Sequence, residues 1–146
     1  MNFDRQTDPS RRWAIRLIAL LAAYQVAAGM YFIALRPSLL PEDLRFMKLA
    51  TLPDEALPWL HLVFTVLGGQ MLAGGLLLVP FIASLKSQAR LGAVSWVCFI
   101  GAELTSVGLM CAVNFLLSSD FRWVLLIPAV AWGIAILLVS ASRRAH

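Results

Sequence analysis

The stretch that decides the fold is residues 91–117, LGAVSWVCFIGAELTSVGLMCAVNFLL, an apolar run that contains a single acidic residue, Glu103. About 20 consecutive apolar residues are enough for a helix to cross a bilayer, so this run is long enough to span one. Glu103 is residue 13 of the 27, which places its carboxyl near the middle of the membrane. A charge at that depth costs about 2.5–3.5 kcal/mol on insertion scales. The carboxyl must therefore be either paired or protonated.

The remainder of the chain is as apolar as this run. Of the 146 residues, 60% are hydrophobic and 14% are charged, and the mean hydropathy is +0.80, whereas soluble proteins carry about 25% charged residues. Three further apolar runs are long enough to cross a bilayer, so we expect spans over 13–35, 59–81, 91–117 and 123–139. The sequence predicts an all-α integral membrane protein, one transmembrane domain over 1–146, folded as an antiparallel four-transmembrane-helix bundle.

The connections between the spans carry helix-start signals. Pro41 followed by two acids is typical of a first helical turn, so we expect a short amphipathic helix between the first two spans. Its apolar side chains, Leu44, Met47 and Leu49, are expected either to lie along the membrane surface or to cap the mouth of the bundle. Thr51 is expected to cap the second span, and the tight connection at 118–120 makes the last two spans antiparallel neighbours.

Helical projection gives the first two spans distinct faces. In the first span, the side centred on Gln25 holds mostly small or apolar residues: Ile18, Ala22, Ala28, Gly29, Phe32 and Arg36. In the second span, one side is centred on Gln70 and also carries Val63, Val66, Ala73, Gly74 and Leu77. The opposite side carries His61, Thr65, Gly68, Leu72 and Gly75. Small residues allow close helix contact, so we expect the second span to lie between two neighbouring helices.

Four side chains share the mid-membrane depth, one on each span: Gln25, Gln70, Glu103 and Trp132. We expect them to face one another. One interpretation is a central polar cavity, in which Glu103 titrates, the glutamines orient it and Trp132 forms an aromatic wall. The other is an interhelical hydrogen-bond cluster that only holds the helices together.

Further polar residues extend this candidate ligand site along the membrane. The side of the third span around Glu103 carries Gly92, Trp96, Phe99, Ser106, Met110 and Asn114. Ser106 and Asn114 are the polar members of that side. His61, near the outer end of the second span, is expected to line an entrance together with Asn114.

No motif points to catalysis, a metal or a cofactor. The sequence contains no nucleophile elbow, phosphate-binding loop or paired catalytic carboxylates, so no catalytic residue is assigned and enzyme activity is not predicted. Cys98 and Cys111 lie 13 residues apart on one helix and cannot form a disulfide with each other. We expect no metal, no cofactor and no nucleic-acid partner.

The distribution of Lys and Arg predicts the orientation. Eight of the 12 basic residues flank the spans on the side of both termini, and four lie on the opposite side. Cytoplasmic segments of membrane proteins are enriched in Lys and Arg, so both termini are expected in the cytoplasm. The first apolar run is too long for a signal-peptide core, and we expect it to remain in the mature protein.

The chain resembles the DoxX-like small four-helix bacterial membrane proteins. The resemblance lies in the four-span layout, Arg16 at the start of the first helix, Gly29 late in it, and the run LGGQMLAGGLLL at 67–78. Members often carry an acid beside that glycine pair, where this chain has Gln70. The resemblance implies a multi-pass protein of the bacterial inner membrane with an accessory role, and no defined chemistry.

Two functions follow as hypotheses. The first is a non-enzymatic accessory or interaction subunit, whose partners are the lipid bilayer and either another membrane protein or a second copy of the chain. The alternative is binding or proton-coupled transport of a small lipophilic or cationic molecule, with Glu103 exchanging a proton as the ligand exchanges. The two differ in whether Glu103 must ionise.

Overall fold

The computed structural model describes residues 9–37, 39–47, 53, 56–87 and 92–144, and all regular structure in these ranges is helical. The elements are α1 (Pro9–Met30), η1 (Tyr31–Leu35), α2 (Pro41–Met47), α3 (Ala56–Lys86), α4 (Ala93–Glu103), η2 (Leu104–Gly108), α5 (Leu109–Leu116) and α6 (Arg122–Arg144). Both η elements are single turns of π-helix that continue the preceding helix. The predicted all-α class is confirmed, and the short helix expected after the first span is α2.

In the described part of the chain, four helical segments are long and apolar enough to cross a membrane: Pro9–Leu35, Ala56–Lys86, Ala93–Leu116 and Arg122–Ser142. They correspond to the four predicted spans. The second extends beyond its predicted end at Phe81, because the helix continues through Pro80 instead of stopping there. Proline removes one backbone donor from a helix, a loss that long membrane helices tolerate. The predicted cap at Thr51 and the surface position of Leu49 lie outside the described residues.

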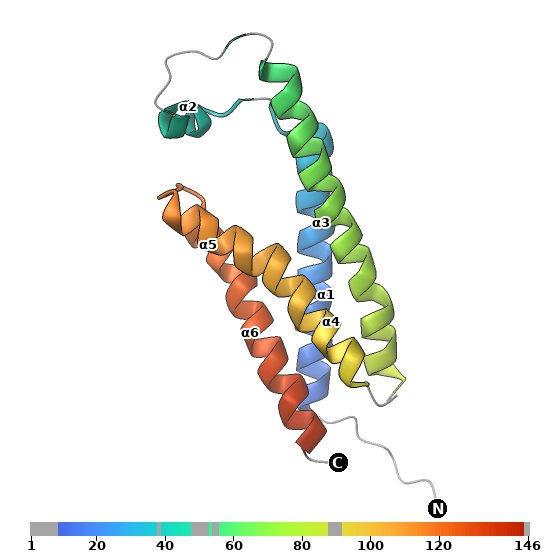
Figure 1. Ribbon diagram of the computed structural model, residues 1–146. Coiled ribbons are helices and arrows are strands. Elements are labelled where there is room, and N and C mark those ends of the chain that lie inside the picture. Colours follow the sequence, from blue (N-terminus) through green and yellow to red (C-terminus); the bar gives the residue numbers. More distant parts are fainter. Residues whose placement is uncertain (1–8, 38, 48–52, 54–55, 88–91, 145–146) are drawn as a thin grey trace, which may run out of the picture.

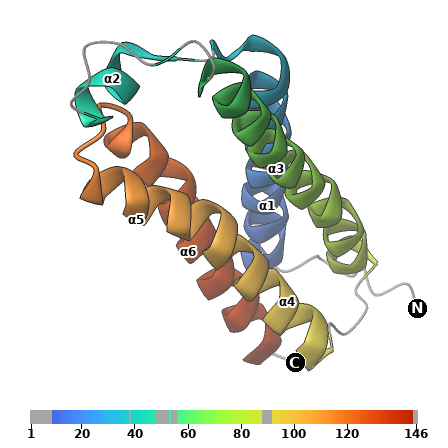
Figure 2. The ribbon, with the colours of Figure 1, turned by 45° about the horizontal axis from the view of Figure 1, so that its top comes forward.

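The helices form two arms with α1 at their junction. Helix α1 packs along α3 and also against α6, while α5 packs on α6. Figure 1 and Figure 2 show that the pair α1–α3 and the pair α4/α5–α6 converge where α1 begins and α6 ends, and diverge toward α2. The apolar core fills the convergent end and includes Ala14, Ile18, Leu21, Phe99, Ala135 and Val139.

Helices α1 and α3 touch backbone to backbone through small residues. A Cβ built on Gly29 would lie 2.7 Å from the carbonyl oxygen of Gly68, and one on Gly68 would lie 2.7 Å from that of Gly29. The contact recurs seven residues away on each helix, between Gly75 and Ala22. A Cβ on Gly75 would lie 2.8 Å from the Ala22 carbonyl oxygen. Such close approach maximises the van der Waals packing that holds membrane helices together. The small faces predicted for these two helices therefore pack on each other.

The π turn η2 changes which side of the third segment faces inward. The buried residues Phe99, Glu103, Val107 and Cys111 follow one another at intervals of four. An ideal helix rotates a four-residue stripe slowly around its axis, but the wider π turn keeps it on one side. A projection at a constant 100° puts Cys111 about 80° from Glu103 and so misses its burial, and it places Met110 and Asn114, which are half-buried, at the centre of this face.

Candidate functional site

The buried polar centre of the molecule is one side-chain pair, the Gln25–Glu103 pair. Gln25 on α1 is 0% exposed and Glu103 at the end of α4 is 1% exposed. The Gln25 Nε2 amide donates to both carboxyl oxygens of Glu103, at 2.7 Å to Oε1 and 2.8 Å to Oε2. The pair joins the two arms at mid-span, as expected for two of the four residues assigned to this layer.

Gly74 of α3 borders this pair, and Trp132 of α6 is the fourth residue that the sequence assigned to this depth. A Cβ at Gly74 would overlap the Gln25 Oε1 atom, so the amide keeps its present position only beside a glycine and would have to shift for a larger residue. Gln25 Oε1 and Trp132 Nε1 are both buried without a hydrogen-bond partner in the described part of the chain. Trp132 itself is half-buried against the apolar core. One acceptor and one donor therefore remain unused in the interior.

Gln70 does not join the pair, and the expectation that it faces Glu103 is wrong. The buried residues of α3 are Gly68, Met71, Gly75, Leu78 and Leu85, whose spacing of three, four and seven residues defines its inward side. Gln70 lies off that side and is exposed. The projection correctly separated the two sides of this helix, but it could not tell which side the first helix covers.

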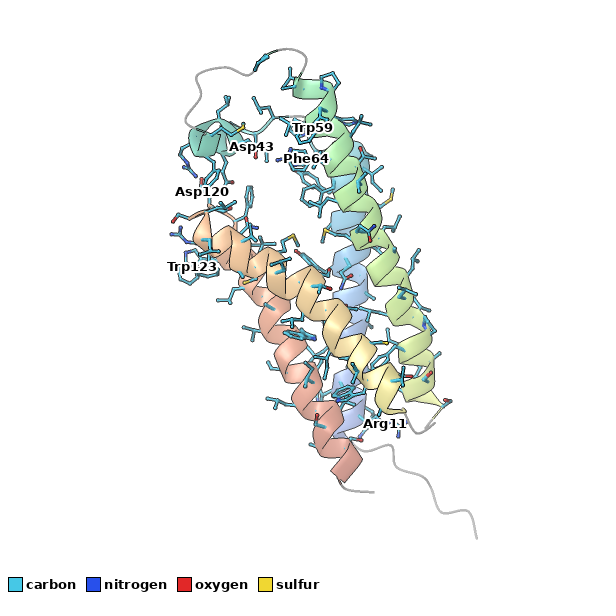
Figure 3. All side chains as sticks on the ribbon, viewed as in Figure 1. Arg11, Asp43, Trp59, Phe64, Asp120 and Trp123 are labelled. Carbon is cyan, nitrogen blue, oxygen red and sulfur yellow. The ribbon has the colours of Figure 1, made fainter. Side chains whose placement is uncertain are left out.

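Three further predicted site residues are separate from the pair. His61 is exposed and lies between Trp59 and Phe64, which Figure 3 shows at the divergent end of α3. The Asn114 side-chain amide donates to the Met110 carbonyl of its own helix, at 2.9 Å. Ser106 is half-buried within η2. The structure thus brings together Gln25 and Glu103, and does not place His61, Gln70 or Asn114 in contact with them.

A second buried polar cluster, which the sequence did not reveal, lies at the divergent end, and we call it the Arg36 clasp. The Arg36 side chain is 5% exposed and its Nη2 lies 2.8 Å from Asp43 Oδ2. Its guanidinium also lies 3.4 Å from the ring centroid of Phe64 on α3, and Asp43 accepts a 2.7 Å bond from the Leu40 amide. The sequence places Arg36 on the Gln25 side of the first span and among the flanking basic residues, and predicts no partner for it. The signal available was the acid seven residues later, at the start of a helix.

Helix α2 connects the two arms where they diverge. The Arg36 clasp ties it to the end of η1 and to α3, while Arg45 Nη2 lies 3.1 Å from Asp120 Oδ2 in the α5–α6 connection. The Asp120 amide also donates to Glu42 at 3.2 Å. Figure 3 shows Asp43, Phe64 and Asp120 gathered around α2 at this end. The helix therefore bridges the open ends of both arms.

We expect Asp43→Asn and Asp120→Asn to have very different effects. Asp43→Asn weakens a largely buried, charge-assisted pair and should lower the free energy of unfolding by about 1–3 kcal/mol. Asp120→Asn is the matched control, because its ion pair is 61% and 71% exposed and exposed pairs contribute roughly 0–1 kcal/mol. Reversible unfolding in mixed micelles measures both. Equal losses would contradict the assignment of Arg36 and Asp43 as the stronger connection.

The chemistry that these groups allow is limited. Among the described residues, no three His, Cys, Asp or Glu side chains are grouped so that they could hold a metal ion. The Gln25–Glu103 pair provides an interhelical hydrogen bond and one carboxyl that can carry a proton. The primary role of the pair is therefore to connect two helices. It could exchange protons only if water or a ligand reached the carboxyl.

Comparison of the chain with protein-family models, with curated proteins and with solved structures finds no match. The resemblance to DoxX-like proteins therefore stays a prediction from the sequence.

Proposed function

We propose that the chain is a multi-pass protein of the bacterial inner membrane, an antiparallel four-helix bundle that acts as a non-enzymatic accessory or interaction subunit. The Gln25–Glu103 pair carries this proposal. Both side chains are buried, and the carboxyl receives both of its short hydrogen bonds from one amide. An acidic residue held in this way serves the contact between α1 and α4 without a ligand.

The outer surface of the spans supports an interaction role. Between 17% and 28% of the residues in the most apolar window of each span are buried within the chain. The remaining apolar surface is available to lipid or to another helix. Because Gly29, Gly68 and Gly75 are already used in the contact between α1 and α3, a partner must contact other faces of these helices.

The orientation with cytoplasmic termini predicts a specific labelling pattern. Two of the four basic residues on the opposite side, Arg36 and Arg45, are paired with carboxylates, and most Lys and Arg residues of the sequence flank the spans on the side of the termini. In a background with both cysteines replaced, we expect an impermeant maleimide to label exposed Pro53→Cys on intact spheroplasts. Exposed Ser87→Cys should react only after lysis. The reverse pattern would overturn the orientation.

A second function, proton-coupled binding or transport of a lipophilic cation, is favoured by a specific observation. Gln25 Oε1 and Trp132 Nε1 are buried and unpaired among the described residues, and buried polar atoms usually have partners. A bound water or ligand group would satisfy them. Glu103 would then exchange its proton with the incoming cation.

Uptake into proteoliposomes separates the two functions. Purified protein is reconstituted with an imposed proton gradient, and accumulation of tetraphenylphosphonium is compared with that in protein-free vesicles. The accessory role predicts equal accumulation in both. Gradient-dependent accumulation above the protein-free level, abolished by Glu103→Gln, would establish the transport role instead.

A further inference from the structure

The side of α3 away from its Gly68 and Gly75 contact with α1 carries a regular stripe, which we call the α3 stripe. Its members are separated by alternating intervals of four and three residues: Trp59, Val63, Val66, Gln70, Ala73 and Leu77. All six are exposed, and Val66 and Leu77 are 64% and 70% exposed. A repeat of this period marks the packing seam of helices that cross at about 20° in left-handed pairs.

Gln70 is the polar member of the α3 stripe and lies at the depth where an unpaired amide has the highest free-energy cost, the middle of the membrane. It is residue 15 of the 31 in α3, so in a spanning helix it stands at mid-membrane. No hydrogen bond joins its side chain to any other described residue. An amide in hydrocarbon without a partner costs several kcal/mol, since no water is present to satisfy it. Because no described residue of the chain bonds it, a group from a neighbouring molecule would satisfy it.

We infer that this group is Gln70 of a second copy, and that two chains pack along their α3 stripes. Copies of one protein insert with the same orientation, so their α3 helices run parallel and the same residue lies at the same depth in each. A glutamine amide has both donors and an acceptor and is complementary to itself across a two-fold axis. Each Nε2 can donate to the Oε1 of the other copy.

The side chains around Gln70 suit this contact. Ala73, one turn away in the stripe, is short and allows the two backbones to approach, while Val63, Val66 and Leu77 provide apolar packing above and below. The opposite side of α3 is held against α1 through Gly68 and Gly75. Within the chain, α4 also contacts α3, where Phe81 stacks on Phe99 at 4.4 Å between ring centroids, so the other copy would be a further neighbour along the stripe.

Crosslinking tests the geometry of the contact. The inference rests on the proposed membrane placement, so the full chain is first reconstituted in vesicles and its insertion is verified by flotation and by the maleimide labelling above. Cys98 and Cys111 are replaced by Ala. Under a mild oxidant, Val66→Cys and Ala73→Cys should form disulfide-linked dimers, because stripe positions lie close across the axis. Leu76→Cys is the control: it is 56% exposed, but points about 120° away from Gln70.

The contribution of the amide is measured as dimer affinity. Single-molecule photobleaching is recorded over a range of protein-to-lipid ratios. Interhelical amide bonds in model peptides contribute about 1–2 kcal/mol, so Gln70→Leu should raise the dimer dissociation constant about 5- to 30-fold. Gln70→Asn keeps the amide and should recover part of this loss.

The outcomes separate cleanly. Chains that fail to insert overturn the proposed function, whereas inserted chains that stay monomeric at every ratio overturn only this inference. Dimers that crosslink best at Leu76→Cys, or that are unaffected by Gln70→Leu, also overturn it. Monomers in pure lipid that crosslink through position 66 or 73 to a different protein in native membranes would assign the stripe to a foreign helix and equally overturn it.

Discussion

Gly68→Ala is expected to destabilise the protein, whereas Gly69→Ala is not. A Cβ on Gly68 would lie 2.7 Å from the Gly29 carbonyl oxygen and 2.9 Å from Phe32 Cβ. Neither atom can move by a change of rotamer, so α1 and α3 must separate. Overpacking of this kind costs about 1–3 kcal/mol. Gly68→Leu should be worse still, since three further heavy atoms enter the same contact.

Gly69 provides a matched control one residue away. A Cβ built there meets no atom within 4 Å, and alanine is favoured over glycine in a helix interior by about 0.5–1 kcal/mol. Gly69→Ala should therefore leave the free energy of unfolding unchanged or raise it slightly. The two substitutions have the same chemistry and nearly the same depth, so any difference between them reports the contact with α1.

Titration with sodium dodecyl sulfate in mixed micelles, followed by tryptophan fluorescence, gives the unfolding free energies. Gly29→Ala should reproduce the loss seen for Gly68→Ala, because the two glycines face each other. The double variant should lose less than the sum of the two, since the first substitution has already opened the interface. Equal stability of Gly68→Ala and Gly69→Ala would show that the helices are not in backbone contact.

The sequence predicts the helices of this protein better than their arrangement. Apolar run length is a local property, so each span was found within a few residues. The inward side of the first span was also found, because Ile18, Ala22, Gln25 and Gly29 share one face and are all buried. Which face of the next helix meets it is a pairwise property, and here the projection could not choose between the sides of Gln70 and Gly68.

The candidate site was found in part for the same reason. Gln25 and Glu103 are each the most polar residue at mid-span, and their pairing follows from the cost of leaving either alone. The Arg36 clasp depends on α2 folding back over η1, which no local pattern encodes. The π turn η2 lies where the third segment passes from contact with α3 to contact with α6. It brings Cys111 to the buried side, where an ideal helix would not place it.

The second large effect is expected at the Gln25–Glu103 pair. Gln25→Met leaves the carboxyl without its donor, and Glu103→Met leaves the Gln25 amide without its acceptor. Each should lower the free energy of unfolding by about 1–3 kcal/mol, with the larger loss where the carboxyl is stranded. The double variant replaces both partners by unbranched apolar chains of similar length and should lie close to the wild type, since removing a whole buried pair is often nearly neutral.

Glu103→Gln connects this stability cycle to function. A glutamine at this position retains an acceptor for Gln25 Nε2, and adds a donor that can turn toward the unused Gln25 Oε1. In the accessory role we therefore expect the variant to match the wild type both in unfolding free energy and in assembly. A variant with unchanged stability that loses cation uptake would show instead that the carboxyl is kept for its proton. Glutamine accepts the same hydrogen bond but has no ionisable group. Stability and cation uptake measured on this one variant therefore distinguish a structural role of Glu103, in holding two helices together, from a role in proton exchange during transport.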